Sequence, residues 1–211
     1  MTTIYYHPLS FPALGPIFTA EALGITYEKK LIDLTKGEHK SDEYLTINPY
    51  GKIPALSDDG FNLAESSAIM RYLAVREDSP LYGPDLQARA KIDQWMDFIV
   101  HSIRSNVGKV QFNRVVAKMF GREGDMKSAE QGIAGLMQNL PHIEAQLETS
   151  NFLCGDEMTL ADIVLIASLE PVDMAGIDIS DFPAVQAFLT SAREETFYTN
   201  VHTHFGAELG K

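Results

Sequence analysis

Two dipeptides in the first third of the chain, Ile53-Pro54 and Glu65-Ser66, have the residue types needed to hold a peptide-like ligand. Proline fixes its own backbone, lacks an N–H group and favours an extended residue before it, so the peptide groups of Ile53 stay available to a ligand. The Asp59-Gly60 pair between two short apolar runs predicts a hairpin, whose second strand leads into a helix at Glu65-Ser66. Because the first turn of a helix has free N–H groups that attract carboxylates, this stretch predicts a clamp for a peptide with a carboxylate.

Ser10 is a hydroxyl residue that lies between a predicted strand and a predicted helix. It follows the run Thr3 to Tyr6, which predicts a strand, and it precedes Pro12, which suits the first turn of a helix. Each candidate also has a purely structural interpretation. Ser10 and Ser66 are typical helix caps, and Pro54 is a typical first residue of a strand. Their joint occurrence favours binding.

The charge of the chain is unevenly distributed. Its 211 residues include 17 Lys and Arg against 29 Asp and Glu, a net charge of -12, which argues against nucleic acid or anionic lipid as a partner. The first 76 residues hold seven basic and nine acidic side chains, whereas the others hold ten and twenty. The first part therefore accepts an anion more easily. Its cations include His39, Lys40 and Lys52, which singly would be ordinary solvated loop charges.

Composition indicates a folded protein of a reducing compartment. Hydrophobic residues make up 45% of the chain, and a single cysteine, Cys154, excludes an internal disulfide framework. No uncharged run reaches membrane-spanning length, and the first residues lack the pattern of a signal peptide, so we expect a cytoplasmic protein. We expect no metal site, because His202 and His204 have no further ligands that the sequence identifies.

The elements that must position these residues form two groups. Up to residue 78 the order is strand, helix, strand, helix, strand, strand, helix, over ranges near 3–6, 12–23, 27–34, 42–45, 53–58, 61–64 and 66–76. This order predicts a small mixed sheet of four strands covered by helices. Ser79 to Pro84 is the best linker candidate, and Asp85 suits the cap of a new helix.

Residues 85–211 have helical periodicity throughout. One apolar stripe has spacings of three and four, at Ile92, Met96, Ile99, Ile103 and Val107. We therefore predict domains at 1–78 and 85–211, the second all helical. Pro141 should kink or divide its helix, Thr159 to Asp162 should cap another, and His202 to Lys211 should form a polar tail.

Four motifs in order along the chain resemble those of the cytosolic glutathione transferases, and most of all the serine-type branch of the phi and theta classes and their bacterial relatives. They are Gly37 to Lys40, Asn48 to Leu56, Glu65 to Ile69 and Thr159 to Asp162. The resemblance implies a thioredoxin-like first domain, an all-helical second domain and a homodimer. It also implies an enzyme that conjugates glutathione to small hydrophobic electrophiles, with glutathione as co-substrate and no tightly bound cofactor.

The resemblance also implies a role for each binding residue. Ile53, before a cis Pro54, would pair its backbone with the cysteinyl part of glutathione. Ser66 and its amide would bind the γ-glutamyl carboxylate, and Glu65 would hold the amino group. The remaining contacts would be cationic, with His39 and Lys40 at the glycine carboxylate and Lys52 as a further cation in reach.

The glutathione thiol must ionise before it reacts, and the resemblance implies that Ser10 stabilises the thiolate. The match is incomplete, because serine-type members often have an arginine four or five residues later, where this chain has Leu14 and Gly15. Tyr5 is the alternative, because it corresponds to the activating position of the tyrosine-type classes. An aromatic packed in the core is the structural interpretation of Tyr5.

The resemblance implies an electrophile pocket among the residues Phe11, Ile103, Val107, Phe112 and Phe120, with Phe11 and Phe112 as the chosen candidates. Tyr50 matches a position where an aromatic side chain can enter the partner subunit. Two alternatives remain for function: glutathione-dependent peroxide or disulfide reduction or dehalogenation, and a non-catalytic binding module of the same fold.

Overall fold

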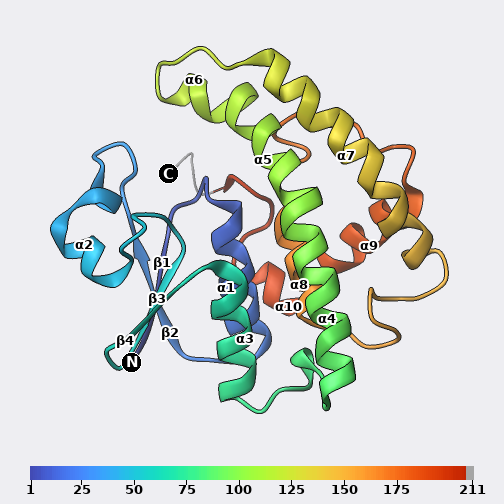
Figure 1. Cartoon of the computed structure of the whole chain (residues 1–211), viewed down its shortest axis with the longest axis horizontal. Coiled ribbons are helices and arrows are strands. Elements are labelled where there is room, and N and C mark those ends of the chain that lie inside the picture. The colour runs from blue at the N-terminus through green and yellow to red at the C-terminus, as the bar shows by residue number, and fades with distance from the viewer. Residues whose placement is uncertain (208–211) are drawn as a thin grey trace.

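The computed structural model describes residues 1–207, which form a mixed sheet next to a helical layer (Figure 1). The strands are β1 (Thr2–Tyr6), β2 (Tyr27–Leu31), β3 (Ala55–Asp58) and β4 (Phe61–Ala64), in the order β2-β1-β3-β4. β1 pairs with β2 in parallel and with β3 antiparallel, and β3 and β4 form the hairpin predicted at Asp59-Gly60. The predicted order of elements is confirmed.

Helices cover both faces of this sheet. α1 (Phe11–Ala22) and α3 (Ser66–Arg76) lie on the face toward the helical layer, and α2 (Asp42–Ile47) lies on the other (Figure 1). Side chains alternate along a strand, so Ile4 of β1 packs under α1 and α3 while its neighbour Tyr5 packs on the side of α2. A single-turn 3₁₀ helix, Glu38–Lys40, precedes α2.

The second half of the described chain is helical, as predicted, apart from one isolated bridge between Phe152 and Gly155. Its α-helices are α4 (Leu86–Phe98), α5 (Ser105–Gln111), α6 (Ala117–Met119), α7 (Met126–Leu147), α8 (Leu160–Leu169), α9 (Pro183–Ala192) and α10 (Thr196–Thr199). Two π-helical stretches, Ile99–Arg104 and Phe112–Val116, join α4, α5 and α6. Asp85 caps α4 as predicted, since its carboxylate accepts hydrogen bonds from the amides of Gln87 and Ala88. A 3₁₀ turn, Pro80–Tyr82, precedes it.

α1 joins the two halves. Its residues Leu14 and Phe18 belong to the same hydrophobic core as those of α4, α7 and α8. A Cβ atom at Gly15 would lie 2.8 Å from the sulfur of Met70 on α3, so this glycine permits the close packing of α1 on α3. The sheet and the helical layer therefore share packed side chains rather than meeting through a loose linker.

α8 begins with the predicted capping box. The buried carboxylate of Asp162 accepts hydrogen bonds of 2.8 Å from the amide and hydroxyl of Thr159 and from the amide of Leu153. The cap thus ties α8 to the preceding loop. None of the described helices has the length and apolarity needed to span a membrane.

In three details the structure corrects or narrows the sequence predictions. The second strand ends at Leu31 rather than near residue 34, because Asp33 accepts hydrogen bonds from the amides of Thr35 and Lys36 and turns the chain. α7 continues through Pro141, which excludes a division there, whereas a kink at Pro141 stays a prediction.

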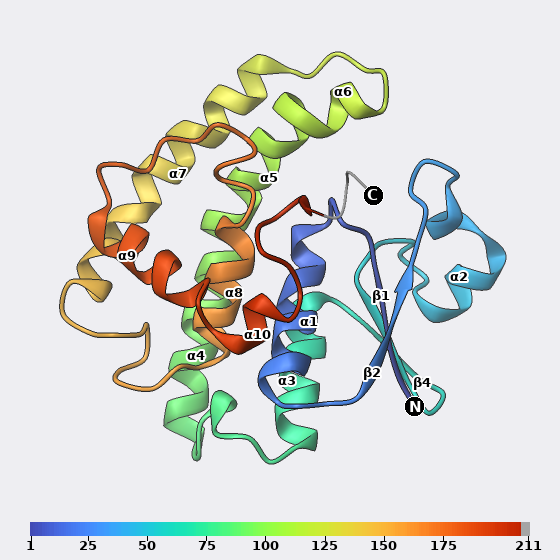
Figure 2. The same cartoon turned by 180° about the vertical axis from the view of Figure 1, so that it is seen from behind.

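The third concerns the C-terminal segment. Residues 202–207 are only partly exposed, at Thr203 and His204, because Phe197 and Tyr198 pack on Phe18 and the following chain runs beside α1 (Figure 2). The side chain of His202 is buried against Glu170, and Phe205 is buried as well. Residues 208–211 of the predicted tail lie outside the described residues.

Candidate active site

The strand register brings the predicted binding residues to one edge of the sheet. Tyr5 near the end of β1 pairs with Ala55 at the start of β3, and Ala55 pairs with Ala64 at the end of β4. The loop that contains Ser10 follows β1, Ile53-Pro54 precedes β3, and Glu65-Ser66 follows β4. β2 is parallel to β1, so it also ends at this edge, before the loop with His39 and Lys40. Four segments far apart in sequence thus meet where a ligand can bridge them.

The loop before β3 is held by side chains that the sequence alone did not single out. The buried Asn48 donates to the carbonyl of Lys52 at 2.6 Å, and the Tyr44 hydroxyl donates to the same oxygen at 2.7 Å. The Asn48 side chain in turn accepts from the amide of Tyr50. Burial raises the pKa of Tyr44 well above its usual range, so this hydroxyl remains a donor. The Asn-Pro turn after α2 was the available signal for such a buried amide.

Ile53 follows this fixed loop. The Ile53–Pro54 peptide bond is cis, as the resemblance implied. Pro54 is buried and Ile53 is half-buried. Among residues 1–207, none of the backbone hydrogen bonds outside helices and strands uses the amide or carbonyl of Ile53. Its peptide groups can therefore pair with an extended peptide.

Glu65 and Ser66 form the start of α3. The backbone of Glu65 is left-handed, with φ of 69°, a conformation that costs a non-glycine residue about 1–3 kcal/mol and that clusters at functional sites. The side chain of Glu65 is exposed and makes no capping hydrogen bond. Ser66, by contrast, is 7% exposed, and its hydroxyl oxygen accepts a hydrogen bond of 2.7 Å from Nη1 of Arg104.

The predicted cations lie around the loop that follows α2. Lys40 Nζ donates to the carbonyl of Gly51 at 3.0 Å. A Cβ at Gly51 would lie 2.7 Å from that nitrogen and 2.8 Å from the carbonyl oxygen of His39, so glycine is needed here, also for its φ of 56°. Burial, and to a smaller extent the charge of Lys40, lowers the pKa of His39, so its imidazole is neutral near pH 7. Lys52 is exposed.

The two hydroxyl candidates for thiol activation have different surroundings. Ser10 is the N-cap residue of α1, yet its side chain makes no capping hydrogen bond, and its amide donates to the carbonyl of His7 at 2.8 Å. Tyr5 is buried beside Ile32 and Ala55, and its ring lies edge-on to that of Tyr44, 5.7 Å between centroids. Tyr5 therefore has the packing of a core aromatic.

The loop that presents Ser10 is ordered by its own residues and by the helical layer. Nδ1 of His7 accepts from the amide of Leu9 at 3.1 Å, and burial lowers the pKa of His7, which Asp33 partly offsets. The side-chain amide of Gln111, on α5, donates to the carbonyl of Leu9 at 3.2 Å. A crevice beside Ser10 is lined on its far side by the C-terminal segment, including His202 and Phe205.

The residues expected at the electrophile pocket are divided by burial. Ile103 and Val107 are fully buried, and Phe11 packs beneath Gly108 of α5. Phe112 is 49% exposed, and Phe120 is at the surface too. Of these five, Phe112 and Phe120 are therefore the ones with surface for an apolar ligand.

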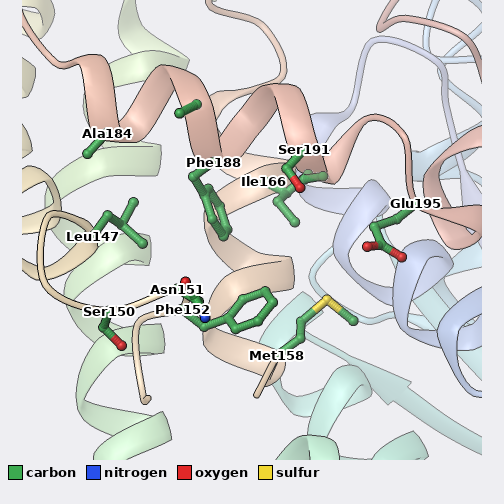
Figure 3. Close-up of a pocket in the computed structure, with 12 residues that line it drawn as sticks. Leu147, Ser150, Asn151, Phe152, Met158, Ile166, Ala184, Phe188, Ser191 and Glu195 are labelled. Atoms are coloured by element: carbon green, nitrogen blue, oxygen red, sulfur yellow. The ribbon is translucent and has the colours of Figure 1, made fainter. Parts of the chain in front are cut away.

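A separate cavity of about 530 Å³ lies within the helical layer, between the end of α7, the loop after it, α8 and α9. Figure 3 shows Phe152, Met158 and Phe188 directed toward its interior, with Ser191 and Glu195 at one end. None of the predicted binding residues lines it. Among the described residues no group of His, Cys, Asp and Glu is placed to hold a metal ion.

Comparison with known proteins supplies the relationship. The family models described as glutathione S-transferase, N-terminal domain, and glutathione S-transferase, C-terminal domain, match residues 1–75 and 86–195. The chain belongs to the glutathione S-transferase family. Glutathione S-transferase F10 of Arabidopsis thaliana is 35% identical over 166 residues, which cover 77% of this transferase and 77% of that protein.

Solved structures agree with this assignment. Glutathione transferase F2 from Populus trichocarpa is 28% identical to this transferase, with a TM-score of 0.88, over 95% of this chain and 97% of that one. The structure of a glutathione S-transferase-I bound with lactoylglutathione is 26% identical, with a TM-score of 0.86 and the same coverage. The predicted fold is therefore confirmed. Conjugation of glutathione, the family's co-substrate, is the general reaction of this enzyme family.

Sequence reasoning also missed Arg104, which contacts Ser66 of the predicted site. Its guanidinium joins Ser66 of α3 to Ser168 of α8. The available signal was a charged residue directly after Ile103, inside the most regular apolar stripe of the helical half.

Proposed function

We propose that this enzyme is a serine-type transferase in which Ser10 stabilises the thiolate of bound glutathione. The observation that supports this most directly is that the Ser10 hydroxyl makes no capping hydrogen bond to α1. Ser10 ends the loop after β1, at the edge of the sheet where the predicted binding residues meet. The amides of the first turn of α1 add a positive potential at the same place.

The energy required is within reach of this arrangement. A free thiol has a pKa of roughly 8.5, and lowering it by about two units takes about 2.7 kcal/mol. A hydrogen bond to a charged group contributes about 1.5–3 kcal/mol, and a helix N-terminus about 0.3–1 kcal/mol. Ser10 and α1 together supply this without any further cation. The arginine that many serine-type members have near this serine is then dispensable here.

Binding would use the rest of the edge. The free peptide groups of Ile53 would pair with the cysteinyl backbone, and Ser66 with the first amides of α3 would take the γ-glutamyl carboxylate. Glu65 would hold the ammonium group, which its exposed carboxylate allows. The glycine carboxylate would lie near Lys40 and Lys52. His39 would act there as a neutral hydrogen-bond donor, since its pKa is lowered.

Tyr5 is the rival activator, and its packing supports Ser10 instead. Its ring is enclosed between the sheet and α2, next to Tyr44. A side chain that is held there has little freedom to follow a ligand thiol at the end of the strand.

The finer properties of the enzyme are part of the same proposal. The electrophile is small and hydrophobic and rests near Phe112, with Phe11 forming the buried floor. The enzyme is a homodimer, in which Tyr50, 63% exposed here, enters the partner. It is cytoplasmic, in keeping with a single cysteine. Sedimentation velocity tests the dimer, for which a monomer at micromolar concentration is the contrary result, and cell fractionation tests the location.

Titration of the bound thiol tests the activator. The ultraviolet absorbance of the thiolate is followed against pH in wild type, Ser10→Ala and Tyr5→Phe, each saturated with glutathione. Ser10→Ala should raise the apparent pKa of the bound thiol by about 1–2 units and lower kcat/KM below pH 7 about 10- to 100-fold. Glutathione affinity should change little.

Tyr5→Phe is the matched control, because it also removes one hydroxyl group. It should leave the titration in place. A shift in Tyr5→Phe together with an unchanged Ser10→Ala would assign activation to Tyr5 and refute the proposal.

A further inference from the structure

The guanidinium of Arg104 is a buried charge that makes no ion pair with any residue that the structure describes. Its side chain is 7% exposed. Nη1 donates to Ser66 and Nε donates to Ser168 at 3.0 Å, whereas Nη2 is buried and has no hydrogen-bond partner. A buried charge that is left unpaired is strongly unfavourable, so this arrangement calls for an anion.

Arg104 donates both of its hydrogen bonds to serine hydroxyl groups, and this decides where the serine protons can go. Ser168 donates its proton to the carbonyl of Val164 at 2.6 Å, so its oxygen is free to accept from Arg104. Because an arginine has no acceptor, Ser66 can only accept from it. The single proton of the Ser66 hydroxyl is therefore left over, and it must point to a further acceptor. Arg104 thus orients Ser66 as a donor at the start of α3.

Two kinds of positive potential meet at that place. The first-turn amides of α3, a helix of eleven residues, lie beside Ser66, and the guanidinium lies behind it. Burial lowers the pKa of Arg104 to about 10, while nearby Glu65 opposes this change, so the guanidinium keeps its charge at neutral pH. Glu65 is exposed and makes no ion pair with it.

We infer that Arg104 is a positioning residue for the γ-glutamyl carboxylate of glutathione: it fixes Ser66 as a donor to that carboxylate, and the carboxylate gives the guanidinium a close counter-charge beyond the field of Glu65. This assignment rests on the proposed function of the site. Arg104 acts through Ser66 and through its field, and it lies at the end of the tripeptide remote from the thiol. The π-helical stretch Ile99–Arg104 ends at this residue, and such stretches are frequent at functional sites.

A comparison of two ligands tests the inference. Calorimetric titration of wild type and Arg104→Met uses glutathione and γ-aminobutyryl-cysteinyl-glycine, which is glutathione without the γ-glutamyl carboxylate. Arg104→Met should weaken glutathione binding about 10- to 100-fold, the loss expected for hydrogen bonding to a charged group. Binding of the second peptide should weaken less than about threefold. In turnover, the KM for glutathione should rise more than kcat falls.

Arg114→Met is the matched control, because Arg114 lies on the same run of helix and donates to two carbonyls, of Ala175 and Gly176, away from Ser66. It should bind both peptides like wild type. Equal losses for both peptides in Arg104→Met, or no loss for glutathione, would overturn the inference.

If Arg104→Met does not fold, Arg104→Lys replaces it in the same titration with the two peptides. Its single nitrogen keeps the charge but cannot reproduce the planar fork, so glutathione binding should weaken by a smaller factor and the second peptide should be unaffected. Equal losses for both peptides again overturn the inference. A wild-type enzyme that fails to bind glutathione would refute the proposed function itself, whereas wild-type binding that is independent of Arg104 refutes only this assignment.

Discussion

Replacing Asp162 by alanine should destabilise the whole enzyme. The Asp162 side chain has 0% exposure and accepts three hydrogen bonds, from the amide of Leu153 and from the amide and hydroxyl of Thr159. Alanine leaves two buried backbone N–H groups without partners, at about 1–3 kcal/mol each, while the Thr159 hydroxyl can turn to another acceptor. The gross cost is thus about 2–6 kcal/mol.

Part of this cost is returned, because a carboxylate is no longer buried. Burial raises the pKa of Asp162, against the effect of its three donors, so the folded chain holds this carboxylate at some expense. We therefore expect a net loss of about 2–4 kcal/mol in the free energy of unfolding. For a chain of this size that lowers Tm by roughly 5–15 °C.

Urea unfolding at one fixed protein concentration measures this loss, since a dimer makes the midpoint depend on concentration. Asp178→Ala is the matched control. Asp178 is exposed and accepts from the amide of Ser180 at 2.9 Å, and we expect a loss below about 1 kcal/mol. Asp162→Asn should fall between the two, because its NH₂ group must face a donor. An Asp162→Ala midpoint close to that of Asp178→Ala would refute the reasoning.

Two further predictions concern the edge of the sheet where the predicted binding residues meet. Burial lowers the pKa of His7 below its value in the unfolded chain, so the unfolded chain binds more protons as the pH falls. The stability that neutral His7 provides is therefore present above about pH 6.5 and is lost as the pH falls through the lowered pKa. His7→Gln should therefore reduce the fall in the urea midpoint between pH 7 and pH 5, and a slope equal to that of wild type would contradict this. Gly51→Ala should raise the KM for glutathione about 5- to 30-fold, equivalent to about 1–2 kcal/mol. The added Cβ would displace Lys40 and the carbonyl of His39, and the positive φ of residue 51 strains any residue other than glycine. Steady-state kinetics checks it, with a KM within about twofold of wild type as the contrary result.

Features that depend on local rules were predictable from the sequence. The hairpin at Asp59-Gly60, the cap at Asp85 and the helix Ser66–Arg76 follow from turn and capping chemistry that a few neighbouring residues determine. The meeting of the predicted binding segments at one edge of the sheet is almost as predictable from the sequence, because an antiparallel hairpin next to a parallel pair of strands allows few sheet topologies. Whether Ser10 and the cations act as expected stays a prediction.

The features that sequence reasoning missed depend on contacts over long separations. The 3.6-residue periodicity correctly places Ile99, Ile103 and Val107 inside, but it does not show that Arg104, next to Ile103, is buried as well and reaches Ser66 on α3. Likewise, the polarity of residues 202–207 indicated solvent. The side chains of His202 and Phe205 are buried instead, because Phe197 and Tyr198 pack on Phe18 more than 170 residues earlier and hold this segment beside α1.

The γ-glutamyl end of the proposed glutathione site consequently depends on both halves of the molecule. Every residue that the resemblance assigned to glutathione precedes residue 67, so sequence alone places the whole binding site in the first domain. The Ser66 hydroxyl, however, is held by Arg104, and Arg104 is held by Ser168 on α8, the helix whose start depends on Asp162. The orientation of the Ser66 hydroxyl is thus determined by the packing of α3 against the helical layer. If Ser66 binds glutathione as proposed, the helical half takes part in that binding as well as forming the expected electrophile pocket.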